Sequence, residues 1–256
     1  MILRGKVFIS TVSTGKSFEM RNIFEPLGAS LVDFPMTEFA EAELTSEILQ
    51  AVTQIEKYDW IIFTSVNGVK YFHSILNKAG ISSIPSSVNI AVVGSKTGLA
   101  LLNAGRNATY TGSGGTGEDM VTELIEKGLV QNCNILLPVG NLASGIPELM
   151  LSELSMPERI NVYNTLKTVN ADNGPVRLIK NNSYDLILFT SPSGVVNFTE
   201  TISAENINPD LRVACIGKVT QRTAEKHGLK CVITADTSTY EGLAYEIMNY
   251  YNNMKN

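Results

Sequence analysis

Cysteine, histidine and tryptophan are scarce in this 256-residue chain, which contains three, two and one of them. The cysteines (Cys133, Cys215 and Cys231) lie in apolar stretches without Cys-x-x-Cys spacing, so we expect buried free thiols in a reducing compartment and no disulfide framework. The histidines, His73 and His227, are far apart in the sequence. A zinc site therefore has little material, and no metal is expected.

Long apolar runs and an excess of positive charge are also absent. No segment reaches the ~20 unbroken apolar residues of a membrane-spanning helix, and the first residues, MILRGKVFIS, lack the layout of a signal peptide. A net charge of -5 is unsuited to a nucleic-acid or anionic-membrane surface. These absences predict a cytoplasmic protein whose partners are neither nucleic acids nor membranes.

Two well-known site motifs are missing as well. Neither Gly-x-x-x-x-Gly-Lys-Ser/Thr nor the Gly-x-Ser-x-Gly elbow occurs, which argues against a P-loop and against an α/β-hydrolase. A glycine-rich segment, TGSGGTG (111–117), follows a weak strand, and we interpret it as a mobile loop and not as a phosphate-binding motif.

What the chain does contain is an internal repeat. The first pair of related segments is DWIIFTSVNGVKYF (59–72) and DLILFTSPSGVVNF (185–198). The second pair is NIAVVGSKTGLALLNAG (89–105) and RVACIGKVTQRTAEKHG (212–228). Phe189 lies 126 positions after Phe63 (189 − 63). This offset predicts two related units of about the same number of residues, each alternating strand with helix.

The positions of the apolar runs indicate that the units are not arranged end to end. The middle of the chain supplies strands for a complete parallel sheet, at 59–64, 89–93, 107–110, 134–138 and 160–163. The C-terminal part has only 185–190, 212–216 and 231–234. Its sheet can be completed by the N-terminal segments: a strand at 6–11, a helix at 15–27 and a strand at 31–35.

We therefore predict a discontinuous domain of residues 1–35 plus 172–256 and an inserted domain of residues 38–163. Two crossings, 36–41 and 164–172, would join them. Strands this apolar need helices on both faces, which predicts two flavodoxin-like, doubly wound α/β domains facing across a cleft. Two Rossmann-type domains are the alternative.

Hydroxyl and glycine residues gather where these strands end. In doubly wound sheets ligands bind beyond the carboxyl ends of the strands, where first-turn N–H groups favour anions. The alternative is that the same residues are plain helix caps. The candidate binding residues are Thr64, Ser65, Gly68, Gly94, Thr97, Thr190, Ser191, Pro192, Ser193, Gly194, Gly217 and Thr220. Nearby lysines could add charge or be solvated surface residues: Lys16, Lys70, Lys96 and Lys218.

These segments, in this order, resemble uroporphyrinogen-III synthases along almost the whole chain. The segments that carry the resemblance are DWIIFTSVNGV, VVGSKTGLAL, VYNT and DLILFTSPSGV…CIGKVT. The resemblance implies two α/β domains on a two-stranded linker, a monomer, and no cofactor. It also implies the reaction: linear hydroxymethylbilane loses its hydroxyl, ring D is inverted through a spiro intermediate, and the macrocycle closes. That substrate carries an acetate and a propionate on each ring, which suits loops that favour anions.

The resemblance also assigns one candidate catalytic residue. Tyr163 matches the tyrosine of a V-Y-x-T segment, and its hydroxyl is expected to help the departing water, although a packed strand tyrosine is the alternative. Gly140 and Asn141 are expected to offer amide groups to the substrate.

The chain departs from its relatives at two places. Thr11 and Val12 stand where bacterial relatives often have Arg-Pro, and Ala143 and Ser144 stand where basic residues often occur. Two expected carboxylate contacts are therefore missing. Non-catalytic alternatives are a two-lobed binding protein for a small multi-anionic ligand, and a response-regulator-like switch. The switch would need a strand-end aspartate, whereas Asp59 and Asp185 precede their strands.

Overall fold

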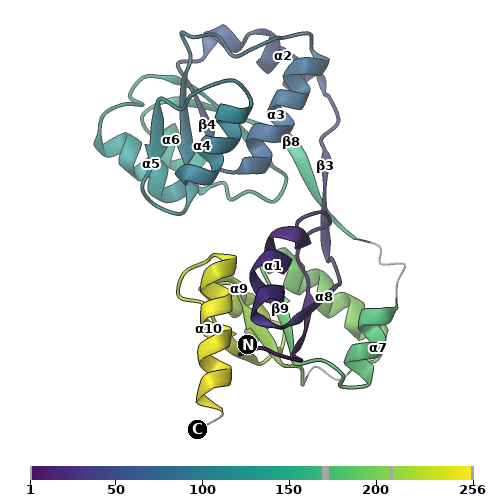
Figure 1. The fold of residues 1–256 in the computed structure, drawn as a ribbon. Helices are drawn as coiled ribbons and strands as arrows, with labels where there is room; N and C mark the ends of the chain where they lie inside the picture. Colours follow the sequence, from purple (N-terminus) through teal and green to yellow (C-terminus); the bar gives the residue numbers. More distant parts are fainter. Residues whose placement is uncertain (1, 169–172, 208–209, 255–256) are drawn as a thin grey trace. The chain divides into compact units, whose positions relative to one another are not determined.

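The computed structural model describes residues 2–168, 173–207 and 210–254 (Figure 1). The chain divides into two compact units: the first unit is Met1–Phe39 with Leu166–Asn256, and the second unit is Ala40–Thr165. Residues 169–172 of the predicted second crossing lie outside the described residues. Among the described residues, no helix has the length and apolar character needed to cross a bilayer.

The first unit is built on a five-stranded sheet of order β11-β10-β9-β1-β2. All its neighbouring strands pair in parallel. Counted along the chain, the order is 2-1-3-4-5, which is the flavodoxin order. The strands are β1 (Val7–Ser10), β2 (Ser30–Asp33), β9 (Leu186–Phe189), β10 (Val213–Cys215) and β11 (Cys231–Thr234). The helices are α1 (Ser17–Phe24), the 3-10 helix η1 (Glu25–Leu27), α7 (Gly174–Lys180), α8 (Pro192–Ala204), α9 (Lys218–Lys226) and α10 (Tyr240–Asn253).

Both faces of this sheet are covered, as its apolar strands predict. Side chains alternate along a strand, so β9 sends Leu186 and Leu188 to one face and Ile187 and Phe189 to the other. The first pair joins the apolar side chains of α1 and α10, and the second pair joins those of α7, α8 and α9. The expected doubly wound arrangement is thus confirmed in this unit.

The second unit has a six-stranded sheet of order β3-β8-β7-β4-β5-β6. Counted from β4, its parallel strands have the order 3-2-1-4-5, as in Rossmann folds. The first unit has the same order when counted from β9, so the repeat in the sequence is a repeat of topology. The strands are β3 (Thr37–Glu41), β4 (Trp60–Phe63), β5 (Asn89–Val93), β6 (Tyr110–Gly112), β7 (Asn134–Gly140) and β8 (Met156–Lys167). The helices are α2 (Ser46–Thr53), η2 (Ile55–Lys57), α3 (Val66–Lys78), α4 (Gly94–Asn103), α5 (Gly117–Glu126) and α6 (Ile146–Ser152).

Strands β3 and β8 are the segments in which the chain passes from one unit to the other (Figure 1). They are neighbours in the sheet and run antiparallel, since Ala42 N donates to Val162 O at one end and Thr168 N donates to Met36 O at the other. The strand predicted at 160–163 is therefore too short. It extends from Met156 to Lys167 because β7 satisfies its first half and β3 its second.

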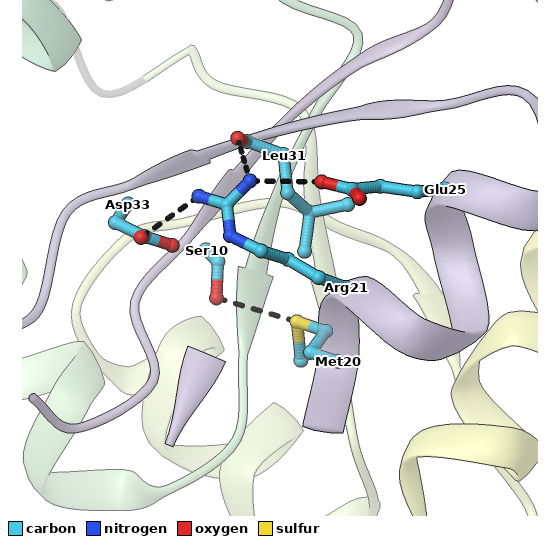
Figure 2. Close-up of polar contacts among 6 residues, drawn as sticks. All are labelled: Ser10, Met20, Arg21, Glu25, Leu31 and Asp33. Atoms are coloured by element: carbon cyan, nitrogen blue, oxygen red, sulfur yellow. Dashed lines mark hydrogen bonds and ion pairs between the residues drawn. The ribbon is translucent and has the colours of Figure 1, made fainter. Parts of the chain in front are cut away.

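The helix predicted at 15–27 is also corrected. It is an α-helix only to Phe24, and a 3-10 turn follows. Pro26, which has no N–H to donate to the preceding turn, explains the break. Arg21 then ties this helix to the edge strand β2 (Figure 2). Its Nη1 donates to Leu31 O at 3.0 Å and its Nη2 donates to Asp33 Oδ2 at 2.8 Å.

The two aspartates that precede β4 and β9 have equivalent structural roles. Asp59 Oδ2 accepts a hydrogen bond from Asn134 N, and Asp185 Oδ2 accepts one from Val7 N, each at 2.8 Å. Each carboxylate therefore holds the start of the neighbouring strand. This placement agrees with the expectation that neither aspartate is a strand-end acceptor.

The three thiols are free, but their burial differs from the expectation. Only Cys215 is buried, whereas Cys133 and Cys231 are half-buried. A hydrogen bond with Cys215 on the neighbouring strand lowers the pKa of Cys231. The same contact, together with burial, raises the pKa of Cys215. The half-buried thiols lie at strand starts: Cys133 immediately precedes β7, and Cys231 is the first residue of β11.

Candidate functional site

A cavity of about 300 Å³ lies in the second unit where β4 and β7 end. The order of strands reverses between these two, and ligands of doubly wound proteins bind at such a switch point. The cavity has an apolar wall formed by Leu137, Val139 and Pro147. Its polar lining comes from the starts of α3 and α5, from the start of α6, and from β8: Thr64, Ser65, Thr116, Glu118, Ser144, Glu148, Arg159 and Tyr163.

The hydroxyl clusters after β4 and β9 are helix caps in both units. Ser65 has extended backbone and its Oγ accepts a hydrogen bond from Gly68 N at 3.0 Å. Ser191 repeats the geometry, and its Oγ accepts from Gly194 N at 3.1 Å. The capping interpretation is therefore confirmed for both serines. A cap satisfies only some of the first-turn amides, so it does not exclude a ligand at the same end.

The glycines of these clusters make room for the protein's own atoms. A Cβ on Gly68 would lie 2.9 Å from Pro138 O, and one on Gly194 would lie 3.1 Å from Ser191 Oγ. Gly94 has a left-handed backbone with φ of +66°, which favours glycine. A Cβ on Gly217 would lie 2.3 Å from Ser238 Oγ. Close backbone packing therefore accounts for Gly68, and the left-handed backbone accounts for Gly94, in each case without a ligand.

The remaining strand-end candidates differ in accessibility. Thr97 and Thr220 are buried, at 4% and 3% exposure, on α4 and α9. Thr190 and Ser193 are half-buried at the start of α8, where Ser193 Oγ lies 3.2 Å from Ser191 Oγ, and Pro192 is the exposed first residue of that helix. Lys96 and Lys218 are exposed. Lys16 and Lys70 lie over the rings of Phe39 and Tyr71, respectively.

Tyr163 lies opposite Gly140 and lines the cavity. Its ring stacks on Tyr71, with centroids 5.5 Å apart, and its Oη is 3.5 Å from Ser65 Oγ. A Cβ on Gly140 would lie 2.5–2.9 Å from three atoms of Tyr163, so only glycine leaves this ring its place. Asn141 is used differently, because its Oδ1 accepts a hydrogen bond from Thr165 N at 2.8 Å.

Arg159 is a cavity residue that the sequence analysis missed. Its Nη2 donates to Gly140 O at 3.3 Å and to Ala143 O at 3.1 Å. No other lysine or arginine of the described residues lines the cavity. The predicted strand began at residue 160, so Arg159 was not counted among the strand residues. A strand predicted to begin at Met156, as β8 does, would have included it.

The glycine-rich segment 111–117 runs from the end of β6 to the first residue of α5. Its mobility stays a prediction. Gly112, Gly114 and Gly117 do have Gly-x-Gly-x-x-Gly spacing. However, Glu123 accepts hydrogen bonds from the amides of Ser113 and Gly114, so these donors face a side chain of the protein. A phosphate would have to displace this carboxylate, and the segment is therefore not a dinucleotide site.

Glu123 supplies a test by pH. Hydrogen bonds from the Ser113 and Tyr110 hydroxyls and from the turn amides lower its pKa to about 2. Because this value lies below the unfolded pKa of about 4.3, the stabilisation is fully present above that value and is lost as the pH falls toward 2. We expect Glu123→Gln to lower the Tm at neutral pH, and the difference from the unsubstituted chain to shrink in acid.

Melting curves between neutral pH and pH 3 would measure this difference. Glu126→Gln is the matched control, since Glu126 is exposed on the same helix and has no polar side-chain contact among the described residues. A Tm difference for Glu123→Gln that stays constant with pH, or that Glu126→Gln reproduces, would contradict the assignment.

Two repeated doubly wound sheets with a cavity at a switch point define a two-domain α/β protein suited to a small-molecule ligand. The family model described as uroporphyrinogen-III synthase HemD matches residues 19–244. The chain belongs to the uroporphyrinogen-III synthase family, and the resemblance stated from its sequence is confirmed. Family membership favours an enzyme over the binding-protein alternative. The substrate class that it implies is a small tetrapyrrole.

Individual relatives agree with this membership. The chain is 24% identical over 258 residues to the uroporphyrinogen-III synthase of Synechococcus elongatus, covering 96% of this chain and 95% of that protein. It is 27% identical over 224 residues to the porphyrin biosynthesis protein HemD of Ruminiclostridium josui. That match covers 87% of this chain and 44% of the relative, so the chain spans less than half of that protein.

Solved structures show the same fold. A mutant uroporphyrinogen III synthase from Thermus thermophilus has a TM-score of 0.64 and 16% identity, with 98% of this chain and 99% of that one covered. Uroporphyrinogen-III synthetase from Helicobacter pylori has a TM-score of 0.61 and 14% identity, with 96% and 99% covered. At these identities the likeness concerns the fold alone.

Proposed function

We propose that the chain is a uroporphyrinogen-III synthase, a hydro-lyase that needs no cofactor. It would convert linear hydroxymethylbilane to uroporphyrinogen III with loss of water and inversion of ring D. The observation that carries this proposal is the family match over residues 19–244. The position of the cavity at a switch point supports it, because that is where the fold binds small molecules.

Substrate binding would depend on local donors, because the chain as a whole has a charge of -5. We propose that first-turn amides and hydroxyls at the starts of α3 and α8 bind substrate carboxylates. The proposed donors are Thr64, Ser65, Thr190, Ser191 and Ser193, while Pro192 and Gly194 would let the substrate approach the start of α8 closely. The other candidates would keep the helix starts and strand ends in place for this binding: Gly68, Gly94, Thr97, Gly140, Asn141, Gly217 and Thr220.

In the chemical step, the proposed role of Tyr163 is to donate a proton to the hydroxyl of the substrate as its C–O bond breaks and water leaves. The electrophile so formed is attacked by a carbon of the terminal ring, and loss of a proton after rearrangement closes the macrocycle. The 3.5 Å separation of Tyr163 Oη and Ser65 Oγ supports this role, because two hydroxyls at a cavity can hold one leaving group between them. Positioning of the folded substrate would supply the rest of the rate.

Isomer analysis of the product tests the proposed reaction. Freshly prepared hydroxymethylbilane is incubated with the purified chain, and the products are oxidised and separated by isomer. We expect the type III isomer to exceed the type I isomer that forms without enzyme. A product distribution identical to that of a heat-inactivated control would rule out the function.

We also propose that residues 38–163 form an independently folding domain and that 1–35 with 172–256 form the other, in a monomeric cytoplasmic protein. The division of the contacts into two units supports the domain proposal. Limited proteolysis is expected to cut first near 36–41 and 164–172. A stable fragment from residue 1 to about 130 would contradict the domain assignment, and a dimer in sedimentation equilibrium would contradict the monomer.

A further inference from the structure

The lining of the second-unit cavity combines an apolar wall with a single cation. Leu137, Val139 and Pro147 supply apolar surface, and Arg159 is the only basic side chain among the described lining residues. Such a lining suits a flat ring that carries a negative group. A volume of about 300 Å³ is at the lower end of the range for ligand pockets, so the cavity has room for one substituted ring and not for four.

The hydrogen bonds of Arg159 leave part of its guanidinium available. Both carbonyl contacts, to Gly140 O and Ala143 O, use Nη2. No described residue accepts from Nη1 or Nε, and none forms an ion pair with this side chain. The carbonyls fix the orientation of the guanidinium, while the N–H groups of Nη1 and Nε remain to donate charge-assisted hydrogen bonds to a carboxylate.

Two carboxylates of the same cavity restrict where an anion can bind. Glu118 and Glu148 also line it, in the first turns of α5 and α6. Neither is paired with Arg159 within the described part of the chain. A substrate carboxylate is therefore repelled from those two places and attracted to one, which orients the ring that bears it.

We propose that Arg159 binds a carboxylate side chain of a single pyrrole ring seated in this cavity. The proposal rests on the proposed function for the identity of the ring, and it adds a specificity-determining residue that neither the motifs nor the family match assigns. Arg159 also compensates for the absence of basic residues at Ala143 and Ser144, because its guanidinium is held at the carbonyl of Ala143.

The competing explanation is that Arg159 only braces the turn after β7. Arg106 provides a matched control, because it also donates to two carbonyls in the same unit, Ile84 O at 2.9 Å and Val88 O at 3.2 Å, but does not line the cavity. A bracing role predicts similar consequences for Arg159→Gln and Arg106→Gln. A binding role predicts that only Arg159→Gln changes the response to carboxylates.

Calorimetric titration with a monopyrrole bearing one acetate and one propionate, compared with its dimethyl ester, tests the proposal. We expect the unsubstituted chain and Arg106→Gln to bind the diacid about 10- to 100-fold more tightly than the diester. Arg159→Gln should lose this preference, and Arg159→Lys should keep part of it. With hydroxymethylbilane, Arg159→Gln should raise KM by a similar factor and leave kcat nearly unchanged.

The proposal is overturned if the unsubstituted chain shows no preference for the diacid, or if folded Arg159→Gln retains it. It is also overturned if Arg106→Gln loses the preference to the same extent. Melting curves establish folding, and Arg159→Lys together with the ester comparison keeps the test valid if Arg159→Gln does not fold. Failure of the proposed function is distinguishable: the product would then be the type I isomer alone, whatever the monopyrrole result.

Discussion

Tyr163→Phe is expected to lower turnover to the type III isomer by about 10²-fold. The substitution removes the hydroxyl 3.5 Å from Ser65 Oγ and keeps the ring that stacks on Tyr71. Packing is therefore preserved, and the loss reports on proton donation to the departing water. The measurement is kcat for the purified variant, with the Tm as a folding control.

Tyr71→Phe is the matched comparison for this change. It removes a hydroxyl from the neighbouring ring of the stack and leaves that of Tyr163 in place, so most of the turnover should remain. If Tyr163→Phe retains full turnover, proton donation by Tyr163 is excluded. Catalysis would then depend on positioning of the substrate alone.

Gly140→Ala is expected to cost about as much, because displacing a catalytic group by about 1 Å can lower a rate by ~10²-fold. The new Cβ would lie 2.5 Å from one Tyr163 ring carbon and 2.6 Å from another. Ordinary van der Waals contact begins near 3.4 Å, so the ring or strand β7 must move. The same shift should lower the Tm, since β7 is buried along most of its length.

Gly145→Ala is the matched control, because it makes the same glycine-to-alanine change at a position without a steric conflict. Gly145 precedes α6 on the same connection, and a Cβ there would meet nothing within 4 Å. Its turnover and Tm should stay close to those of the unsubstituted chain. Equal activities for Gly140→Ala and Gly145→Ala would show that the place of the Tyr163 ring does not matter to the reaction.

The elements of the fold could be predicted because each is encoded locally. The run at 89–93 became β5 with the same ends, and the Thr-Ser-x-x-Gly pattern at 64–68 became the Ser65 cap of α3. The C-terminal part of the chain has too few strands for a sheet, which predicted that N-terminal strands would complete it. The topology confirms this, because β1 and β2 lie in the same sheet as β9, β10 and β11. Boundary errors lie at the helix broken by Pro26, at β8, which depends on a distant pairing partner, and at the strand predicted at 107–110, which is β6 at Tyr110–Gly112.

The candidate site was predicted in part, since the cavity depends on residues far apart in the sequence. The apolar periodicity and the capping residues determined by themselves two α/β units with hydroxyl groups at their strand ends. Only the tertiary structure decided that Arg159 and Tyr163 would lie beside the end of β7 and the turn that follows it. That placement depends on the β7–β8 register, which shifts by one residue between Val139 and Gly140 and places Tyr163 opposite Gly140. Side chains alternate along a strand, so such a shift changes which of them face the cavity, and no local pattern in the sequence encodes it.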